Sequence, residues 1–89
     1  HRTQRRTLTK GQFYLRPGQI NSEFAFINSG AIRIFQTMSD GQDHTAWLAV
    51  GGQSFCDLAS FREQRPTRFS VQALTDANLL VVSFADMQH

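Results

Sequence analysis

Hydrophobic and polar residues alternate over short stretches along most of this chain, and turn-forming residues separate the stretches. Residues 7–15 contain two such stretches on either side of a Lys-Gly pair at 10–11. Residues 24–27 form another, which ends at Asn-Ser-Gly at 28–30. Alternation broken by such residues is typical of half-buried strands joined by turns, so we expect short strands in this half of the chain.

The clearest pair of strands lies in the middle of the chain. Residues 31–37 alternate, an Asp-Gly pair follows at 40–41, and residues 44–50 alternate again. Asp-Gly between two alternating stretches predicts a tight hairpin. Its return strand then has Trp47 on one face and Leu48 on the other.

Residues 55–61 have a different pattern, because Leu58 and Phe61 are three positions apart. With Asp57 at its start, this spacing predicts one or two helical turns, and Pro66 prevents their continuation. A further alternating strand then runs to residue 73. Its inward face is expected to be Thr67, Phe69, Val71 and Ala73, and its outward face Arg68, Ser70 and Gln72.

The last strand is expected at 79–84, and Ser83 and Asp86 have the spacing of a capping box, which predicts a helix from about Phe84. Seven or eight short strands at near-regular spacing predict an all-β sandwich or jelly roll.

Composition limits the other possibilities. The 89 residues suffice for one domain, 1–89, and a net charge of +2 does not indicate a nucleic-acid surface. The cluster of Arg2, Arg5, Arg6 and Lys10 is interpreted as a solvated edge strand. A single cysteine excludes a disulfide framework within the chain and fits a cytoplasmic protein. No apolar stretch approaches the roughly 20 residues of a membrane span.

The order of these turns and strands resembles the cyclic-nucleotide-binding superfamily, in particular the sensor domains that begin Crp–Fnr-type bacterial transcription regulators. The resemblance rests first on the opening strands and glycine turns at residues 10–11, 17–19 and 26–33, and on the central hairpin at 40–42. Residues 52–61 stand at the place of the phosphate-binding cassette, and residues 71–74 and 79–87 resemble the closing strands and the entry to the helix. The resemblance implies a double-stranded β-helix (jelly roll) with short helices and the start of a C-terminal dimerisation helix. A helix-turn-helix domain is expected outside this chain.

The cassette departs from the pattern of the nucleotide-binding relatives. These relatives have a Gly-Glu pair at the helix start and, ten residues later, an arginine followed by a small residue. Here Cys56-Asp57 and Thr67 stand at those places. Arg68 is the nearest arginine, and Phe69 follows it where a small residue is needed. We therefore expect no cyclic nucleotide bound by the usual contacts, unless a bulge near Pro66 re-aims Arg68. The candidate ligand-binding residues are Phe55, Cys56, Asp57, Leu58, Thr67, Arg68 and Phe69.

Several single residues allow two interpretations. Cys56 is a redox sensor or a packed small residue, and we favour packing. Asp57 accepts a ligand hydrogen bond or stabilises the helix end. His44 ligates haem or lies on the surface, and we favour the surface. Arg62, Arg65 and Arg68 bind an acidic metabolite or form a solvated loop. The large aromatic residues are interpreted as core: Trp47, Phe55, Phe61 and Phe69.

No catalytic group or metal cluster is readable, so we predict a regulatory domain with no cofactor and not an enzyme. Its effector is an unidentified small molecule, and DNA is contacted only through the absent domain of a homodimer. Two alternatives stay open. One is a cyclic-nucleotide domain of a channel, kinase or transporter, and the other is a cupin-type enzyme, against which the single interior histidine argues.

Overall fold

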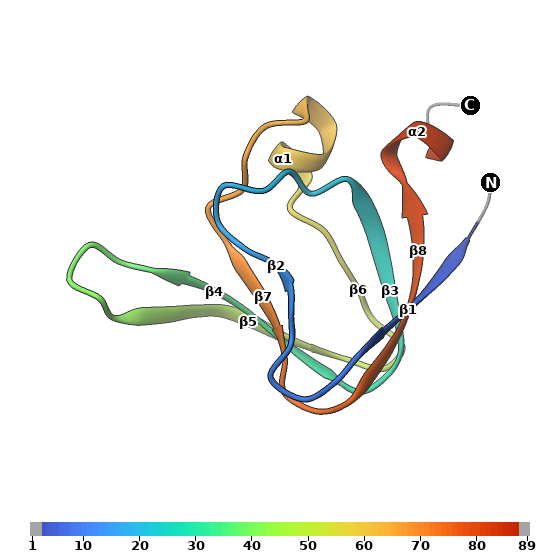
Figure 1. Ribbon diagram of the computed structural model, residues 1–89, viewed down its shortest axis with the longest axis horizontal. Coiled ribbons are helices and arrows are strands. Elements are labelled where there is room, and N and C mark those ends of the chain that lie inside the picture. The colour runs from blue at the N-terminus through green and yellow to red at the C-terminus, as the bar shows by residue number, and fades with distance from the viewer. Residues whose placement is uncertain (1–2, 88–89) are drawn as a thin grey trace.

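The computed structural model describes residues 3–87 and consists of two antiparallel four-stranded sheets that face each other (Figure 1). The strand orders are β1-β8-β3-β6 and β2-β7-β4-β5. The elements are β1 Gln4–Leu8, β2 Phe13–Leu15, β3 Glu23–Ser29, β4 Ala31–Thr37, β5 Asp43–Val50, β6 Ser54–Phe55, α1 Leu58–Glu63, β7 Ser70–Ala73, β8 Ala77–Ser83 and α2 Phe84–Met87. This arrangement is the jelly roll that the alternating pattern predicts.

Most expected elements are present. The strand β4 has the predicted bounds, α1 is the expected short helix, and Ser83 Oγ accepts a hydrogen bond from Asp86 N at the start of α2. The two-residue strand β6 was not predicted, because two residues carry no periodicity. It forms only by pairing with β3, where Ala25 is opposite Phe55 and Phe26 is opposite Ser54.

The core lies between the sheets and is almost entirely aliphatic. Its most deeply buried large side chains are Ile27, Ile32, Leu79 and Val81. Ile27 comes from β3 and Ile32 from β4, so each sheet contributes through alternate residues, as period-two patterning requires.

The predicted faces of the strand 67–73 are correct for Thr67, Val71 and Ala73, which are buried, but wrong for Ser70, which is also buried. Ser70 does lie on the outward side of β7, yet it is opposite Phe35 of β4 in the register. The Phe35 ring is itself buried and packs on Phe13 of β2, with ring centroids 6.3 Å apart. Phe13 and Phe35 come from the strands on either side of β7 and pack together on the outward side of the sheet, which alternation does not predict.

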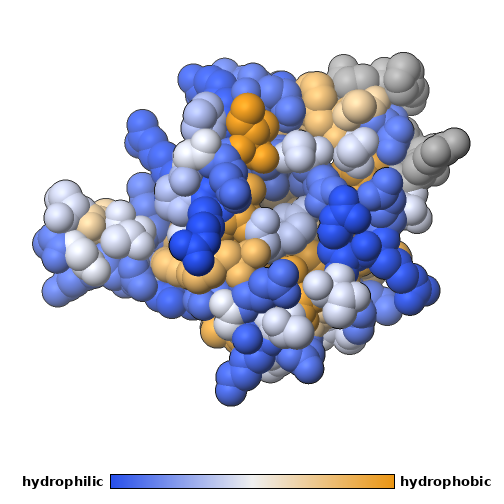
Figure 2. Space-filling view, in the orientation of Figure 1, coloured by the Kyte–Doolittle hydropathy of each residue, from blue (hydrophilic) through white to orange (hydrophobic). Residues whose placement is uncertain are grey.

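The hairpin of β4 and β5 extends well beyond the sandwich (Figure 1). Its turn is closed by the Met38 N–H, which donates to Gln42 O at 2.8 Å, and by Gly41 at a φ of +87°. The tip of the hairpin is largely hydrophilic on the face seen in Figure 2. It is the tight turn expected from the Asp-Gly pair.

The basic N-terminal segment is an edge strand, as expected, because β1 ends the order of its sheet. Arg2 lies outside the described residues. Arg6 is not merely solvated: its guanidinium donates to Glu23 Oε2 at 2.5 Å, and the Tyr14 hydroxyl donates to Glu23 Oε1 at 2.6 Å. Burial, followed by the bond to Glu23, raises the pKa of Tyr14, so the phenol stays a donor. Three consecutive strands are joined through one carboxylate.

Within residues 3–87, no helix has the length and apolar character needed to cross a membrane.

Gly30, between β3 and β4, has a φ of +104°, and a Cβ added there would lie 2.6 Å from Asp76 O and 2.7 Å from Ala77 Cα. Gly41 has a similar φ, but nothing lies within 4 Å of its added Cβ. We predict that Gly41→Ala costs about 1 kcal/mol of unfolding free energy, from the left-handed backbone alone. Gly30→Ala should cost at least about 2 kcal/mol more, because β8 must move away. Urea unfolding of both variants measures this, and equal losses would show that the close approach to β8 is unimportant.

Candidate functional site

A cavity of about 310 Å³ lies at the expected cassette, between α1, the chain leading into it and the inner face of the sheet containing β4 and β7. Among the predicted site residues, Phe55, Cys56, Asp57, Leu58 and Phe69 line it. Thr67 and Arg68 do not line this cavity. The structure thus brings together five of the seven candidates.

Asp57 is the N-cap of α1. Its Oδ1 accepts a hydrogen bond from Ser60 N at 3.3 Å, and its Oδ2 accepts one from the Thr67 hydroxyl at 2.5 Å. An aspartate whose side chain satisfies a free N–H of the first turn is a common helix start. Both carboxylate oxygens therefore have partners within the chain, which favours the helix-end interpretation of Asp57.

Thr67 connects the helix start to β7. Its Oγ1 also accepts from Phe69 N at 3.1 Å, and its backbone N–H donates to Gln19 O at 2.7 Å. Its carbonyl accepts from Gly18 N at 3.0 Å, and the side chain is buried. These bonds hold Thr67 in one orientation, so this residue is a structural link between the segment 18–19, α1 and β7.

Arg68 is exposed, as the strand pattern predicts. The bulge near Pro66 that could have re-aimed Arg68 is not found: Pro66 forms a β-bridge with Ile20, and the register shifts lie elsewhere, for example at Ile34/Phe35. Arg68 instead borders an adjoining surface hollow that Arg65 also lines, and this hollow shares Asp57, Ala59 and Phe69 with the cavity. Arg65 is paired with Glu63 at 3.2 Å, and both side chains are largely exposed, which agrees with a solvated loop.

Cys56 lines the cavity next to Asp57 and is half-buried. Burial and the neighbouring Asp57 raise the pKa of its thiol to about 11, although the bond from Asn21 Nδ2 to Sγ, 3.0 Å long, lowers it. At neutral pH the group is a thiol, which is a poor nucleophile. Packing is the interpretation that the geometry favours.

The sequence prediction missed the other six described residues that line the cavity, which are Leu15, Asn21, Ile34, Trp47, Ala59 and Val71. Trp47 was interpreted as core, and this is wrong: the side chain is 45% exposed and lies at the cavity opening. It is opposite Ile34 in the register, and Ile34 also lines the cavity. Asn21 lies outside the strands that the pattern predicts, and the structure buries it beside α1, where its backbone N–H donates to Ser60 Oγ. Phe55 and Phe61 are core, as expected, and Phe69 is partly buried against the core.

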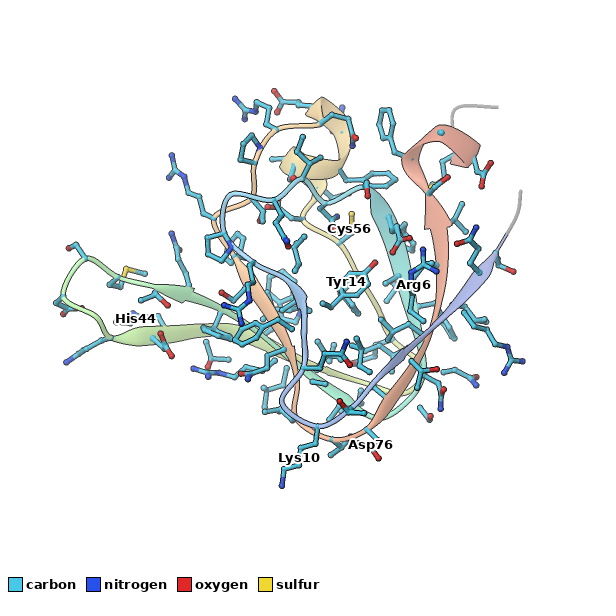
Figure 3. The ribbon with its side chains drawn as sticks, viewed as in Figure 1. Arg6, Lys10, Tyr14, His44, Cys56 and Asp76 are labelled. Atoms are coloured by element: carbon cyan, nitrogen blue, oxygen red, sulfur yellow. The ribbon has the colours of Figure 1, made fainter. Side chains whose placement is uncertain are left out.

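His44 is exposed on the projecting hairpin, away from Cys56 and Tyr14, which lie inside the roll (Figure 3). This placement agrees with a surface histidine. No group of three or more potential metal-ligating residues occurs between residues 3 and 87.

The charge of the cavity wall differs from that of an anion site. None of the side chains that line the cavity in the described part of the chain is lysine, arginine or histidine. The polar contributors are Asn21, Cys56 and Asp57, and the rest are apolar. A phosphate placed here would meet no opposite charge from the wall.

We predict that Thr67→Val lowers the free energy of unfolding by about 1–3 kcal/mol, because it leaves Asp57 Oδ2 and Phe69 N without their partner. Thr67→Ser keeps the hydroxyl and is the control, with a loss of less than about 1 kcal/mol. Chemical denaturation of both variants measures the difference. If valine and serine cost the same, the hydroxyl bonds do not hold this site together.

Comparison with known proteins gives a consistent result. The model of the family described as "Cyclic nucleotide-binding domain" matches residues 5–89. The Thermus thermophilus catabolite activator protein has a similar structure, with a TM-score of 0.89 and 27% identity over 97% of this chain and 40% of that protein. The N-terminal domain of a Streptomyces coelicolor transcriptional regulator has a TM-score of 0.86 and 21% identity, over 97% of this chain and 61% of that protein. The sensor domain of the Pseudomonas aeruginosa regulator DNR has a TM-score of 0.86 and 20% identity, over 97% of this chain and 57% of that protein.

No curated protein sequence matches the chain significantly. The chain spans about 40 to 61% of the length of these three solved structures. Its fold is that of the sensor domains of Crp–Fnr-type transcription regulators. Because the family model covers nearly the whole sequence, the chain belongs to the cyclic nucleotide-binding domain family.

Proposed function

We propose that this chain is one effector-sensing domain of a Crp–Fnr-type transcription regulator, and that it does not hold cyclic AMP by the usual contacts. The regulator is cytoplasmic, is a homodimer and is not an enzyme. It binds DNA through a separate domain. The proposal is supported by membership of the family and by the likeness to the catabolite activator protein.

The observation that carries the sensing role is that α1 contacts both the cavity and α2. Leu58 and Ala59 of α1 line the cavity. Phe61 of the same helix packs edge-to-face on Phe84, the first residue of α2, with ring centroids 5.4 Å apart. A ligand that displaces α1 therefore also displaces the ring on which α2 begins.

A second connection runs through the loop before β3. Asn21 lines the cavity, and its backbone N–H donates to Ser60 Oγ in α1 at 2.9 Å. The next residue, Ser22, accepts a hydrogen bond from Phe84 N at 2.7 Å. The cavity wall and the start of α2 thus share a short segment. Two arrangements of α1 and α2 would suffice to re-aim an attached domain.

The wall chemistry supports the second part of the proposal. A cyclic nucleotide phosphate needs an arginine and free backbone N–H groups. At the place of that arginine stands Thr67, which is bonded to Asp57, and Arg68 is exposed outside the cavity. Asp57 Oδ2 is occupied by this bond, so the carboxylate is less available to a ribose hydroxyl.

The coupling is tested without knowledge of the effector by Ala59→Phe, which places a ring at the cavity from α1. We predict that the amide resonances of residues 84–87 shift in ¹H–¹⁵N spectra. Arg62→Phe, on the same helix but outside this cavity, is the matched control and should leave them in place. The double variant Ala59→Phe/Phe61→Ala should lose the effect. The sensing role is contradicted if Ala59→Phe shifts the Trp47 indole signal and leaves α2 unchanged.

Nucleotide titration tests the ligand part. A site with a Kd of 10 µM would stabilise the domain by about 2.7 kcal/mol at 1 mM ligand, which raises the melting temperature by several degrees. We predict no such rise with cyclic AMP or cyclic GMP, because the cavity wall offers no cation. A rise of that size with either nucleotide overturns this part of the proposal.

A further inference from the structure

The cavity can bury a neutral ligand far more readily than a charged one. Besides its apolar residues, the wall has three polar side chains, of which only Asp57 is charged, and it is negative. Both of its oxygens already accept hydrogen bonds. A buried anion would be repelled and unpaired, and a cation would have to displace Ser60 N or Thr67 from Asp57.

Asn21 offers one unused hydrogen-bond acceptor. Its side chain is only 2% exposed and lines the cavity. The amide nitrogen donates to Cys56 Sγ, whereas the amide oxygen accepts no hydrogen bond from residues 3–87. No buried side-chain nitrogen or oxygen of the described residues lacks a hydrogen-bond partner, so this unbonded oxygen is reached by solvent. A ligand that excludes water from it must supply an N–H or O–H in its place, or the acceptor is left unsatisfied.

The cavity opening carries two exposed apolar side chains from opposite elements. Trp47 of β5 is 45% exposed, and Leu58 of α1 is 60% exposed. An indole side chain presents a flat face on which another ring stacks in an offset or edge-to-face arrangement. The volume of about 310 Å³ is at the small end of the roughly 300–1,000 Å³ usual for small-molecule sites. These features suit a flat ligand of modest size.

We propose that the cavity binds an uncharged aromatic compound with a single ring N–H or O–H group, which stacks against Trp47 and donates to Asn21 Oδ1. This inference rests on the proposed function, because it names the class of effector for the same cavity. Asn21 sets the requirement for a donor, the wall without cations sets the requirement for neutrality, and Trp47 sets the requirement for a ring.

Three matched probes separate these requirements. Indole is flat, neutral and has one N–H; benzothiophene has the same shape without the donor; indole-3-carboxylate adds a negative charge. By calorimetry we expect indole to bind, benzothiophene to bind about five-fold more weakly from the loss of one hydrogen bond, and indole-3-carboxylate to bind at least about ten-fold more weakly. The Trp47 indole cross-peak, unique in this chain, should shift with indole.

Two variants assign the contacts. Trp47→Ala should weaken indole binding about ten-fold, while Leu48→Ala, an exposed neighbour on the same strand outside the cavity, should not. Asn21→Ala should remove the preference for indole over benzothiophene. If this buried substitution prevents folding, the comparison of the two probes on the unaltered chain still tests the donor. Absence of indole binding, equal binding of benzothiophene, tighter binding of the carboxylate, or equal effects of Trp47→Ala and Leu48→Ala would each overturn the inference.

The inference and the proposed function fail in different ways. If Ala59→Phe shifts α2 but indole does not bind, the domain senses an effector of another class. If indole binds as described but neither indole nor Ala59→Phe shifts α2, the cavity is a binding site without the proposed coupling.

Discussion

The hydrogen bond between Thr67 and Asp57 is the constraint on which the site depends. Asp57 caps α1 with one carboxylate oxygen and holds Thr67 with the other. Thr67 is in turn bonded to the segment before β3 and to the entry of β7. The start of α1, where Asp57 lines the cavity, is therefore held by hydrogen bonds within the chain. In the nucleotide-binding pattern that the sequence resembles, an arginine stands at the place of Thr67.

In the proposed function, Thr67 at this place changes what the same fold recognises. A jelly roll keeps its shape through the aliphatic layer between its sheets, and none of the deeply buried side chains Ile27, Ile32, Leu79 and Val81 is a cassette residue. The cassette can therefore lack the arginine that would pair with a phosphate while the fold stays the same. What is left is an apolar hollow between β7, α1 and β5, with Asn21 as the polar group that has unused capacity. The contact of Phe61 with Phe84 is made by a residue of α1 that does not line the cavity, so it does not depend on the chemistry of the ligand.

The sequence predicted the elements better than it predicted the site. Strands and turns follow from local preferences, so β4, the hairpin turn and the start of α2 were all located correctly. Five of the seven candidate residues do line the cavity, because their order along the chain resembles a known family. Trp47 was assigned to the core, and Asn21 lies in no stretch with a periodic pattern. Alternation gives the face of a strand on which Trp47 lies, but it does not give the elements that lie opposite that face.

Alternation, glycine turns and capping residues by themselves determined an all-β roll with short helices, since each depends on backbone preferences of a few neighbouring residues. The absence of an arginine ten residues after Asp57 was also readable from the chain. Only the tertiary structure decided that Thr67 would take both the bond to Asp57 and a buried position, that Ser70 would be covered by Phe35, and that Trp47 would stand at an opening. These outcomes depend on which distant strands become neighbours, and burial is a property of that arrangement.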